Sequence, residues 1–219
     1  CGNGTFLEYL GRQGDFELHG IEPIGKSGDR AEKLEGLKVR RGFLEENTFE
    51  KLYFDAIILT HVFEHLPNPL KSLKTISAIA ADNAILQIEI PNVNSIQYKL
   101  FKAKWLHLDP PRHLNMFPPK VLKEELNKLG WELNLERDFS PQFNPYGVQQ
   151  SLLNLLLKRR EVLYEYLKGN KSYTKDYSQL SLGLQKAFDW VTFPFFVSTD
   201  LIASVFKKGG TVKLRFRKK

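Results

Sequence analysis

The feature that most constrains the fold is an alternation of apolar runs with helical segments over residues 1–138. Residues 54–60 and 84–90 are nearly continuous apolar runs, a pattern typical of strands covered on both faces. The segment between them, residues 69–80, has the spacing of a helix. Strands that alternate with helices through short connections build parallel sheets. We therefore predict an α/β fold with a doubly wound, mostly parallel sheet.

The other predicted elements follow from hydrophobic period and from the residues that start and stop helices and strands. The pair Pro118-Pro119 opens a helix that Gly130 ends, which is a normal start and stop. We predict this helix over 120–129. Further helices are predicted over 5–12 and 27–34, and further strands over 16–21, 37–43 and 131–136.

The last third of the chain has a different pattern. Residues 152–167 have the spacing of one amphipathic helix, and residues 180–206 are apolar with Pro194 in the middle. Residues 212–217 then alternate apolar and basic side chains, as a strand with one polar face does. We predict that this strand closes the sheet in the antiparallel direction after a helical insertion. The expected parts are a cofactor-binding domain over 1–140, a helical insertion over 141–208, and the closing strand over 209–219.

Composition excludes several classes of protein. Of 219 residues, 42% are hydrophobic and 26% are charged, which is the balance of a soluble globular chain. The single cysteine, Cys1, excludes an internal disulfide and a multi-cysteine zinc site, which suits a reducing compartment. We therefore expect a cytoplasmic protein, with contact at a membrane surface as the alternative.

Positive charge is concentrated toward the end of the chain. Residues 1–139 hold 18 basic and 20 acidic residues, whereas residues 140–219 hold 14 and 5. We expect the helical insertion to carry most of the excess. Such a segment could face nucleic acid, an anionic membrane or an acidic substrate, or be a solvated face. We do not favour nucleic acid as a partner.

The sequence opens on a glycine-rich run, Cys1-Gly2-Asn3-Gly4, followed directly by a helical segment. We expect the strand that leads into this loop to precede residue 1. A glycine turn before a helix lets a ligand approach the backbone and its free N–H groups. Glu22 lies 18 residues after Gly4, near the spacing of a carboxylate that binds ribose hydroxyls, although Leu7 stands where a third glycine is usual. The combination predicts an adenosine-containing ligand.

Four segments together resemble one enzyme family. Residues 1–7, 20–23, 54–69 and 130–133 follow the order and spacing of class I S-adenosylmethionine-dependent methyltransferases. The chain looks most like the group that includes the ubiquinone-biosynthesis O-methyltransferases. The resemblance covers about residues 1–138 and the closing strand, and it implies a Rossmann-like sheet.

This resemblance implies S-adenosylmethionine as cofactor and S-adenosylhomocysteine as product. In the family, the glycine loop holds the methionine part, the acid holds the ribose, and residues after the fourth strand line the pocket. Where a small or acidic residue usually reaches the adenine, this chain has Phe43-Leu44, so Phe43 could pack on the ring and Glu45 could substitute for the polar contact. The implied cofactor-binding residues are Gly2, Asn3, Gly4, Glu22, Phe43, Leu44, Thr60 and His61.

Two short patterns suggest other chemistry. Residues 20–27 match G-x-x-x-x-G-K-S, but Glu22 would place a carboxylate beside the phosphates, so we reject a phosphate loop. Residues 61–65 match the zinc-peptidase pattern H-x-x-E-H, but Pro67 leaves little helix and no third ligand is evident. We predict no metal site: Glu64 caps or pairs locally.

A proline-stiffened segment, residues 105–117, holds two histidines and an arginine at the edge where open α/β sheets bind ligands. In related methyltransferases this region covers the acceptor. If the acceptor is a hydroxyl, a neutral histidine is a suitable base, and His107 and His113 are the catalytic candidates. His65 and Arg112 are the candidates for substrate binding. The alternative is a surface loop with Leu114 and Phe117 as core anchors.

We therefore predict a methyltransferase that acts on a small-molecule or lipid- or sugar-linked acceptor, with a hydroxyl favoured. The alternative is a non-catalytic nucleotide-binding regulatory module of the same fold. The aromatic part of the insertion either forms a lid over the acceptor or a dimer contact, or it docks on an anionic membrane.

Overall fold

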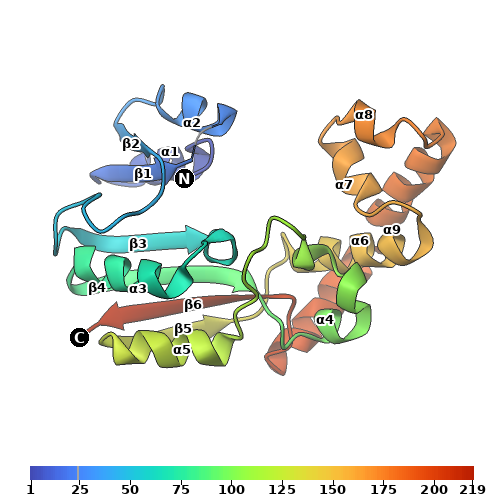
Figure 1. Ribbon diagram of the computed structural model, residues 1–219. Coiled ribbons are helices and arrows are strands. Elements are labelled where there is room, and N and C mark those ends of the chain that lie inside the picture. The colour runs from blue at the N-terminus through green and yellow to red at the C-terminus, as the bar shows by residue number, and fades with distance from the viewer. Residues whose placement is uncertain (24) are drawn as a thin grey trace. The chain divides into compact units, whose positions relative to one another are not determined.

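The computed structural model describes residues 1–23 and 25–219 (Figure 1). It divides into two compact units, Cys1–Glu50 and Lys51–Lys219. In the first unit, β1 and β2 pair in parallel, with Leu18 opposite Leu37 and Glu22 opposite Arg41. The elements of this unit are α1 (Thr5–Gly11), β1 (Leu18–Glu22), α2 (Lys26–Ala31) and β2 (Leu37–Arg41).

The second unit is built on a four-stranded sheet with the order β3-β4-β6-β5. β3 and β4 are parallel, whereas β6 runs antiparallel to both of its neighbours. The predicted α/β class and the antiparallel last strand are confirmed. The strands are β3 (Phe54–Thr60), β4 (Ala80–Pro91), β5 (Trp131–Arg137) and β6 (Thr211–Lys218).

The centre of this sheet is the pairing of β4 with β6. Leu86 lies opposite Phe216 and Ile88 opposite Leu214, and all four side chains are buried. Burying each of them contributes roughly 1.5–3 kcal/mol. The strand that ends the chain is therefore part of the core.

Helices α3 (Pro69–Ile79) and α5 (Pro119–Lys128) belong to the same unit. Asn68 caps α3, since its side chain accepts a hydrogen bond from the Lys71 amide at 3.2 Å, and Pro69 fits the first turn. A short helix, α4 (Ile96–Phe101), follows β4 and is capped by Ser95. Three single 3-10 turns complete the connections: η1 (Phe63–His65), η2 (Lys102–Lys104) and η3 (Leu106–Leu108).

A helical segment lies between β5 and β6 in the chain. The prediction of one helix over 152–167 is wrong, because the chain leaves the helix at Leu157 and Glu161 has a positive φ of 59°. The Asn154 side chain accepts a hydrogen bond from the Glu161 amide at 2.7 Å, which fixes this break. The helices are α6 (Asn144–Leu156), α7 (Val162–Leu167), α8 (Lys171–Thr174) and α9 (Gln179–Val205).

Charge is distributed differently from expectation in this region. Residues 141–208 hold nine basic and five acidic residues, while residues 209–219 hold five basic residues and no acidic one. The expectation that the insertion carries most of the excess is therefore wrong. No helix among the described residues is long and apolar enough to cross a membrane.

The side chain of Asn144, which is fully buried, joins the helical segment to the sheet. Its Nδ2 donates to the Asp138 carbonyl at 2.8 Å and to Asp200 Oδ2 at 3.1 Å. Its Oδ1 accepts from the Thr211 hydroxyl at 2.9 Å. One amide thus connects the end of β5, the start of α6, α9 and the start of β6.

We expect Asn144→Ala to lower the free energy of unfolding by about 2–4 kcal/mol, because it leaves three buried polar groups without this partner. Urea denaturation followed by circular dichroism measures the change. Asn127→Ala, at an exposed position of α5, is the matched control and should change stability by less than about 0.5 kcal/mol. Equal effects of the two substitutions would contradict the role of Asn144.

Candidate active site

In the first unit, residues 1–4 form a tight turn before α1. Gly2 and Gly4 have positive φ angles of 59° and 80°. A Cβ on Gly4 would lie 2.5 Å from Leu34 Cδ1 and 3.3 Å from Ala31 Cα, so packing and backbone both require glycine there. A Cβ on Gly2 would meet nothing within 4 Å. The loop therefore has one packed glycine and one whose backbone is open to a ligand.

The Asn3 side chain makes its hydrogen bonds within this segment. Its Oδ1 accepts hydrogen bonds from the Thr5 amide at 3.2 Å and the Thr5 hydroxyl at 2.8 Å. These contacts fix the start of α1. A contact between Asn3 and a cofactor stays a prediction.

Glu22 lies at the carboxyl end of β1, beside the glycine loop. Its Oε2 accepts from the Gly2 amide at 2.6 Å and lies 2.9 Å from the Cys1 nitrogen. Its Oε1 makes no hydrogen bond with the residues that the structure describes, and 23% of the side chain is exposed. The carboxylate thus holds the loop with one oxygen and has the other available for a hydroxyl.

A pocket of about 520 Å³ lies in the same unit, around the end of β2. Phe43 is 63% exposed and lines this pocket together with Glu45, whereas Leu44 does not. The volume lies within the usual range for small-molecule sites. The open glycine, the available carboxylate oxygen and the pocket beside Phe43 fit an adenosine-containing cofactor. The remaining lining residues are Ile21, Arg40, Arg41, Gly42, Asn47 and Thr48.

The rejected phosphate-loop pattern, residues 20–27, includes Ile24, which lies outside the described residues. Beside it, the Arg41 guanidinium donates to the Gly25 carbonyl and pairs with Asp29. A Cβ on Gly28 would overlap the same guanidinium. The first turn of α2 is thus covered by arginine.

In the second unit, the chain turns sharply where β3 ends. Thr60 is the last residue of β3, and His61 has a positive φ of 51° while its amide donates to the Glu89 carbonyl at 3.0 Å. The turn η1 follows, and the His61 ring lies against Glu64, with His61 Nδ1 3.2 Å from Glu64 Oε1. Of the two residues predicted to line the cofactor pocket, His61 therefore contacts Glu64, and Thr60 precedes His61 at the end of β3.

Residues 109–117 are held against η1 by backbone hydrogen bonds. The Glu64 carbonyl accepts from the amides of Leu114 and Asn115 at 2.9 and 3.0 Å. The Asn115 side chain donates to the Leu66 carbonyl at 2.6 Å, and the Phe117 ring packs edge-on against Phe63 at 5.2 Å. Phe117 therefore anchors the segment, whereas Leu114 is 58% exposed.

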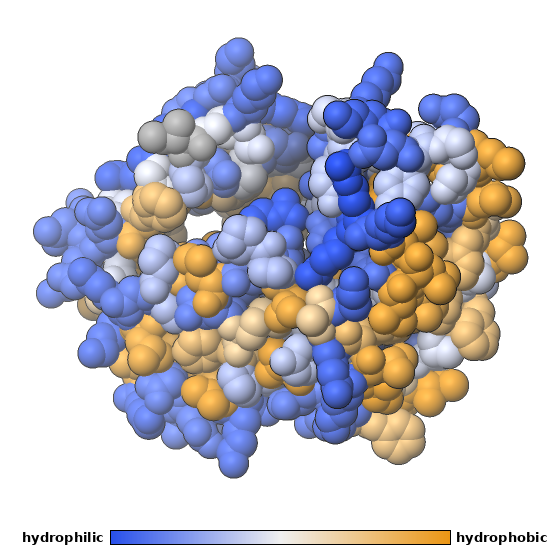
Figure 2. Space-filling model, turned by 45° about the vertical axis from the view of Figure 1, so that its right-hand side comes forward, coloured by the Kyte–Doolittle hydropathy of each residue, from blue (hydrophilic) through white to orange (hydrophobic). Residues whose placement is uncertain are grey.

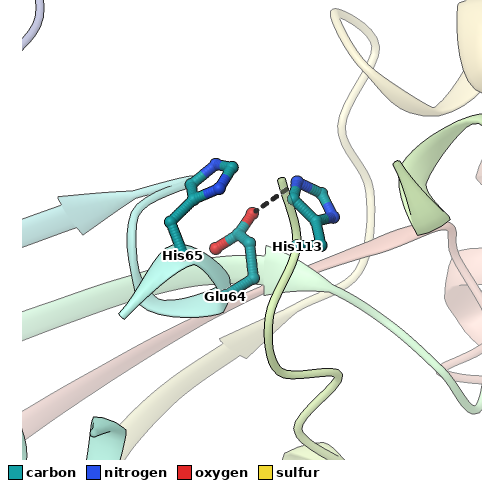
Figure 3. A group of neighbouring side chains, drawn as sticks. All are labelled: Glu64, His65 and His113. Atoms are coloured by element: carbon teal, nitrogen blue, oxygen red, sulfur yellow. Dashed lines mark ion pairs between the residues drawn. The ribbon is translucent and has the colours of Figure 1, made fainter. Parts of the chain in front are cut away.

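This arrangement gathers Glu64, His65 and His113 into one cluster (Figure 3). The two imidazole rings are in edge-on contact, with their centroids 4.7 Å apart, and the Glu64 carboxylate lies beside them. The Glu64 side chain is 1% exposed, its Oε1 lies 3.9 Å from His113 Nε2, and its Oε2 has no hydrogen-bond partner among the described residues.

Backbone carbonyls orient both rings of the cluster. His65 Nδ1 lies 2.8 Å from the Arg112 carbonyl, and His113 Nδ1 lies 2.8 Å from the His107 carbonyl. A carbonyl oxygen can only accept, so Nδ1 carries the proton in each ring. In the neutral form, each Nε2 then has a free lone pair.

His107, one of the two catalytic candidates, is half-buried, with its Nε2 atom shielded from solvent. Burial lowers its pKa to about 3, with the charges of His61 and His113 adding to the effect. Its Nε2 packs against Gly147, where a Cβ would lie 2.4 Å away. The ring therefore stays neutral and tightly packed, while its carbonyl orients His113. A role for His107 as a base stays a prediction.

His113, the other candidate, is largely buried, and this burial lowers its pKa although Glu64 acts in the opposite direction. Arg112 is half-exposed and pairs with Asp109 at 2.7 Å, and this hydrogen bond raises the pKa of Arg112. Glu161 lies 3.6 Å from the same guanidinium. Arg112 thus has two acidic partners within the chain, and its contact with substrate stays a prediction.

The structure brings the predicted residues together in two groups, one in each unit. Gly2 and Glu22 meet in the first, and His61, His65 and His113 meet in the second. Sequence reasoning missed Glu64 as the centre of the second group. The signal was the H-x-x-E-H pattern, which we tested only as a helical motif, although a single 3-10 turn presents the same side chains.

Comparisons with known proteins agree with this geometry. A family model described as a methyltransferase domain matches residues 1–136. No curated protein matches the chain.

Several solved structures share the fold. One is a protein of Galdieria sulphuraria provisionally named a sarcosine dimethylglycine methyltransferase, with 17% identity over 100% of this chain and 76% of that one, and a TM-score of 0.60. An S-adenosylmethionine-dependent methyltransferase of Archaeoglobus fulgidus has 19% identity over 100% and 83%, and a TM-score of 0.57.

A third is a phosphoethanolamine N-methyltransferase of Haemonchus contortus, in complex with phosphomonomethylethanolamine and S-adenosylhomocysteine. It has 12% identity over 100% of this chain and 47% of that one, and a TM-score of 0.54. At such identities these likenesses show the fold alone. The family match over residues 1–136 goes further, and the chain belongs to the class I S-adenosylmethionine-dependent methyltransferases.

Proposed function

We propose that the protein transfers the methyl group of S-adenosylmethionine to a hydroxyl of a small-molecule or lipid- or sugar-linked acceptor. The observation that carries this proposal is the family match, which includes both the glycine loop and the turn with Glu64. The geometry at Gly2 and Glu22 supports the cofactor half of the proposal, and the histidine cluster supports the acceptor half.

In this proposal Glu22 binds the two ribose hydroxyls through its available oxygen, while the open backbone at Gly2 allows the methionine part to approach. Phe43 packs against the adenine from the wall of the pocket. Hydrogen bonds to a charged group are worth roughly 1.5–3 kcal/mol each. Glu22 is thus the side chain on which cofactor affinity should depend most.

When bound, S-adenosylmethionine supplies a sulfonium methyl carbon, to which the acceptor oxygen bonds while the electron pair of the broken bond stays on sulfur. The protein then has to align the acceptor, exclude water and accept the hydroxyl proton. The cluster of Glu64, His65 and His113 lies beside Thr60 and His61, where the family has its cofactor pocket. We therefore place the acceptor hydroxyl at this cluster.

The cofactor half is tested by titrating S-adenosylhomocysteine into the full chain in a calorimeter. We expect Glu22→Ala to weaken binding at least ten-fold, because about 1.4 kcal/mol corresponds to a factor of ten. Glu35→Ala, an exposed acid in the turn after α2, is the control and should bind like the wild type. Unchanged affinity in Glu22→Ala would rule out this pocket.

The acceptor half is tested by measuring S-adenosylhomocysteine release with matched hydroxyl and amine compounds, both free and lipid-linked. We expect turnover with hydroxyl acceptors and a loss of at least ten-fold in kcat for His113→Gln, with unchanged affinity for S-adenosylhomocysteine. Cofactor binding without turnover on any acceptor would instead favour a regulatory module. Turnover on amines alone would contradict the proposal that the acceptor group is a hydroxyl.

A lipid-linked acceptor is favoured by the exposed face of α9. A stripe of apolar side chains spaced by three, four or seven residues stays exposed there, each between 62% and 79%. Figure 2 shows such side chains gathered over the helical segment. Lys186 lies one turn before Trp190, which is 76% exposed. The stripe consists of Leu184, Val191, Phe195, Ile202 and Val205, and the exposed Phe206 follows at the end of the helix.

We infer that this stripe docks on an anionic membrane, since Lys186 lies on the same helix, Lys207 and Lys208 follow it directly in the chain, and aromatic side chains insert at lipid headgroups. We expect sedimentation with phosphatidylglycerol vesicles but not with phosphatidylcholine, weakened by salt, by Lys186→Glu and by Phe195→Ser. Leu70→Ser, at an exposed site on α3, should have no effect. A dimer in light scattering without vesicle binding would assign the stripe to a second copy instead.

A further inference from the structure

We propose that Glu64, His65 and His113 bind a divalent transition-metal cation that activates the acceptor. The inference deepens the proposed function and rests on it. Each of the three residues offers one ligand atom, and these atoms lie within 4.8 Å of one another. Two imidazoles and one carboxylate form a donor set typical of zinc, iron(II) and related ions.

In Glu64 one carboxylate oxygen, Oε1, has a close partner, at 3.2 Å from His61 Nδ1, and the unpaired second oxygen of Glu64 is the strongest observation. The Glu64 side chain is 1% exposed, and its Oε2 has no hydrogen-bond partner among the residues that the structure describes. Buried polar atoms are nearly always satisfied, because leaving one unpaired costs about 1–3 kcal/mol or more. A cation beside this oxygen removes that cost.

The orientation of the two histidines points to the same conclusion. Both rings donate Nδ1–H to a backbone carbonyl, at 2.8 Å in each case. This is the contact by which metal-binding histidines are usually held, and it directs Nε2 toward the ion. At 3.9 Å, His113 Nε2 and Glu64 Oε1 are too far apart for a hydrogen bond with each other.

The distances allow a cation after small side-chain movements. With metal–ligand bonds of about 2.0–2.1 Å, the ligand atoms of a tetrahedral site lie roughly 3.3 Å apart. The cluster would have to contract by about 1.5 Å at most, which side-chain rotation can supply. The rigid surroundings also favour a site, since the Glu64 carbonyl binds the amides of Leu114 and Asn115 and thus fixes both segments.

Three protein ligands leave at least one coordination position open, which is characteristic of catalytic rather than structural metal sites. An acceptor hydroxyl fits such a position. The cation would make this hydroxyl more acidic and position it for attack on the methyl carbon, with the proton released to solvent.

The test titrates Zn²⁺, Mn²⁺ and Mg²⁺ separately into the full chain after removal of metals with EDTA. We expect one Zn²⁺ per chain by calorimetry and by elemental analysis after desalting. Co²⁺ should give the visible absorption of a site with nitrogen and oxygen ligands. Glu64→Gln, His65→Gln and His113→Gln should each weaken Zn²⁺ binding at least ten-fold.

His19→Gln, which changes a histidine outside the cluster, is the matched control and should bind Zn²⁺ like the wild type. His65 is the least buried ligand, so His65→Gln keeps the test valid if the other variants do not fold. No Zn²⁺ or Mn²⁺ binding, or binding that survives all three substitutions, would overturn the metal site. Turnover that EDTA does not affect would also overturn the metal site, although the proposed methyl transfer would stand. A lack of S-adenosylhomocysteine binding would contradict the proposed function and not the metal site.

Discussion

The buried amide of Asn144 is the interaction on which the second unit depends most. A helical segment of more than sixty residues enters between β5 and β6, yet β6 has to return beside β4 for the sheet to close. Asn144 binds the last residues before the segment and the first residue of β6, through Asp138 and Thr211. The backbone carbonyl of Asn144 also accepts a hydrogen bond from the Gln97 side chain at 3.0 Å, which adds α4 to the same network.

This network extends to the histidine cluster through a short chain of contacts. Gln97 accepts from the indole N–H of Trp105 at 3.1 Å, and Trp105 packs edge-on against the His107 ring. The His107 carbonyl then orients His113. The insertion therefore does more than cover a surface, because α6 packs Gly147 against His107 and so supports the segment that carries His113.

Much of this architecture could be predicted from the sequence, because hydrophobic periodicity and the residues that start or stop helices and strands act locally. Residues 54–60 form β3 as predicted, and Asn68-Pro69 starts α3. The pair Gly209-Gly210 directly precedes the last strand. In the structure, a Cβ on Gly209 would lie 2.0 Å from the Asp138 carbonyl, so this glycine also permits a close tertiary contact.

The break between α6 and α7 could not be predicted, because the leucines on either side keep helical spacing. The hydrogen bond from the Glu161 amide to the Asn154 side chain fixes the break against that spacing. The cluster of Glu64, His65 and His113 could not be predicted for a related reason. We read the H-x-x-E-H pattern as a helix, whereas the residue that completes the cluster, His113, lies 48 positions after His65. Only the hydrogen bonds between the Glu64 carbonyl and residues 114–115 bring the two together. The closer resemblance to ubiquinone-biosynthesis enzymes stays a prediction.

The four histidines of the second unit differ in environment, and this difference separates their roles. His107 has a shielded Nε2 and a pKa lowered to about 3 by burial, so its ring contributes packing while its carbonyl orients a neighbour. His61 bridges the end of β3 and Glu64. His65 and His113 each combine an Nδ1 fixed by a carbonyl with a ring nitrogen within 4.8 Å of the buried carboxylate. The positions of these histidines in the sequence assigned them to catalysis, substrate binding and cofactor binding, whereas the partner of each ring nitrogen distinguishes their environments.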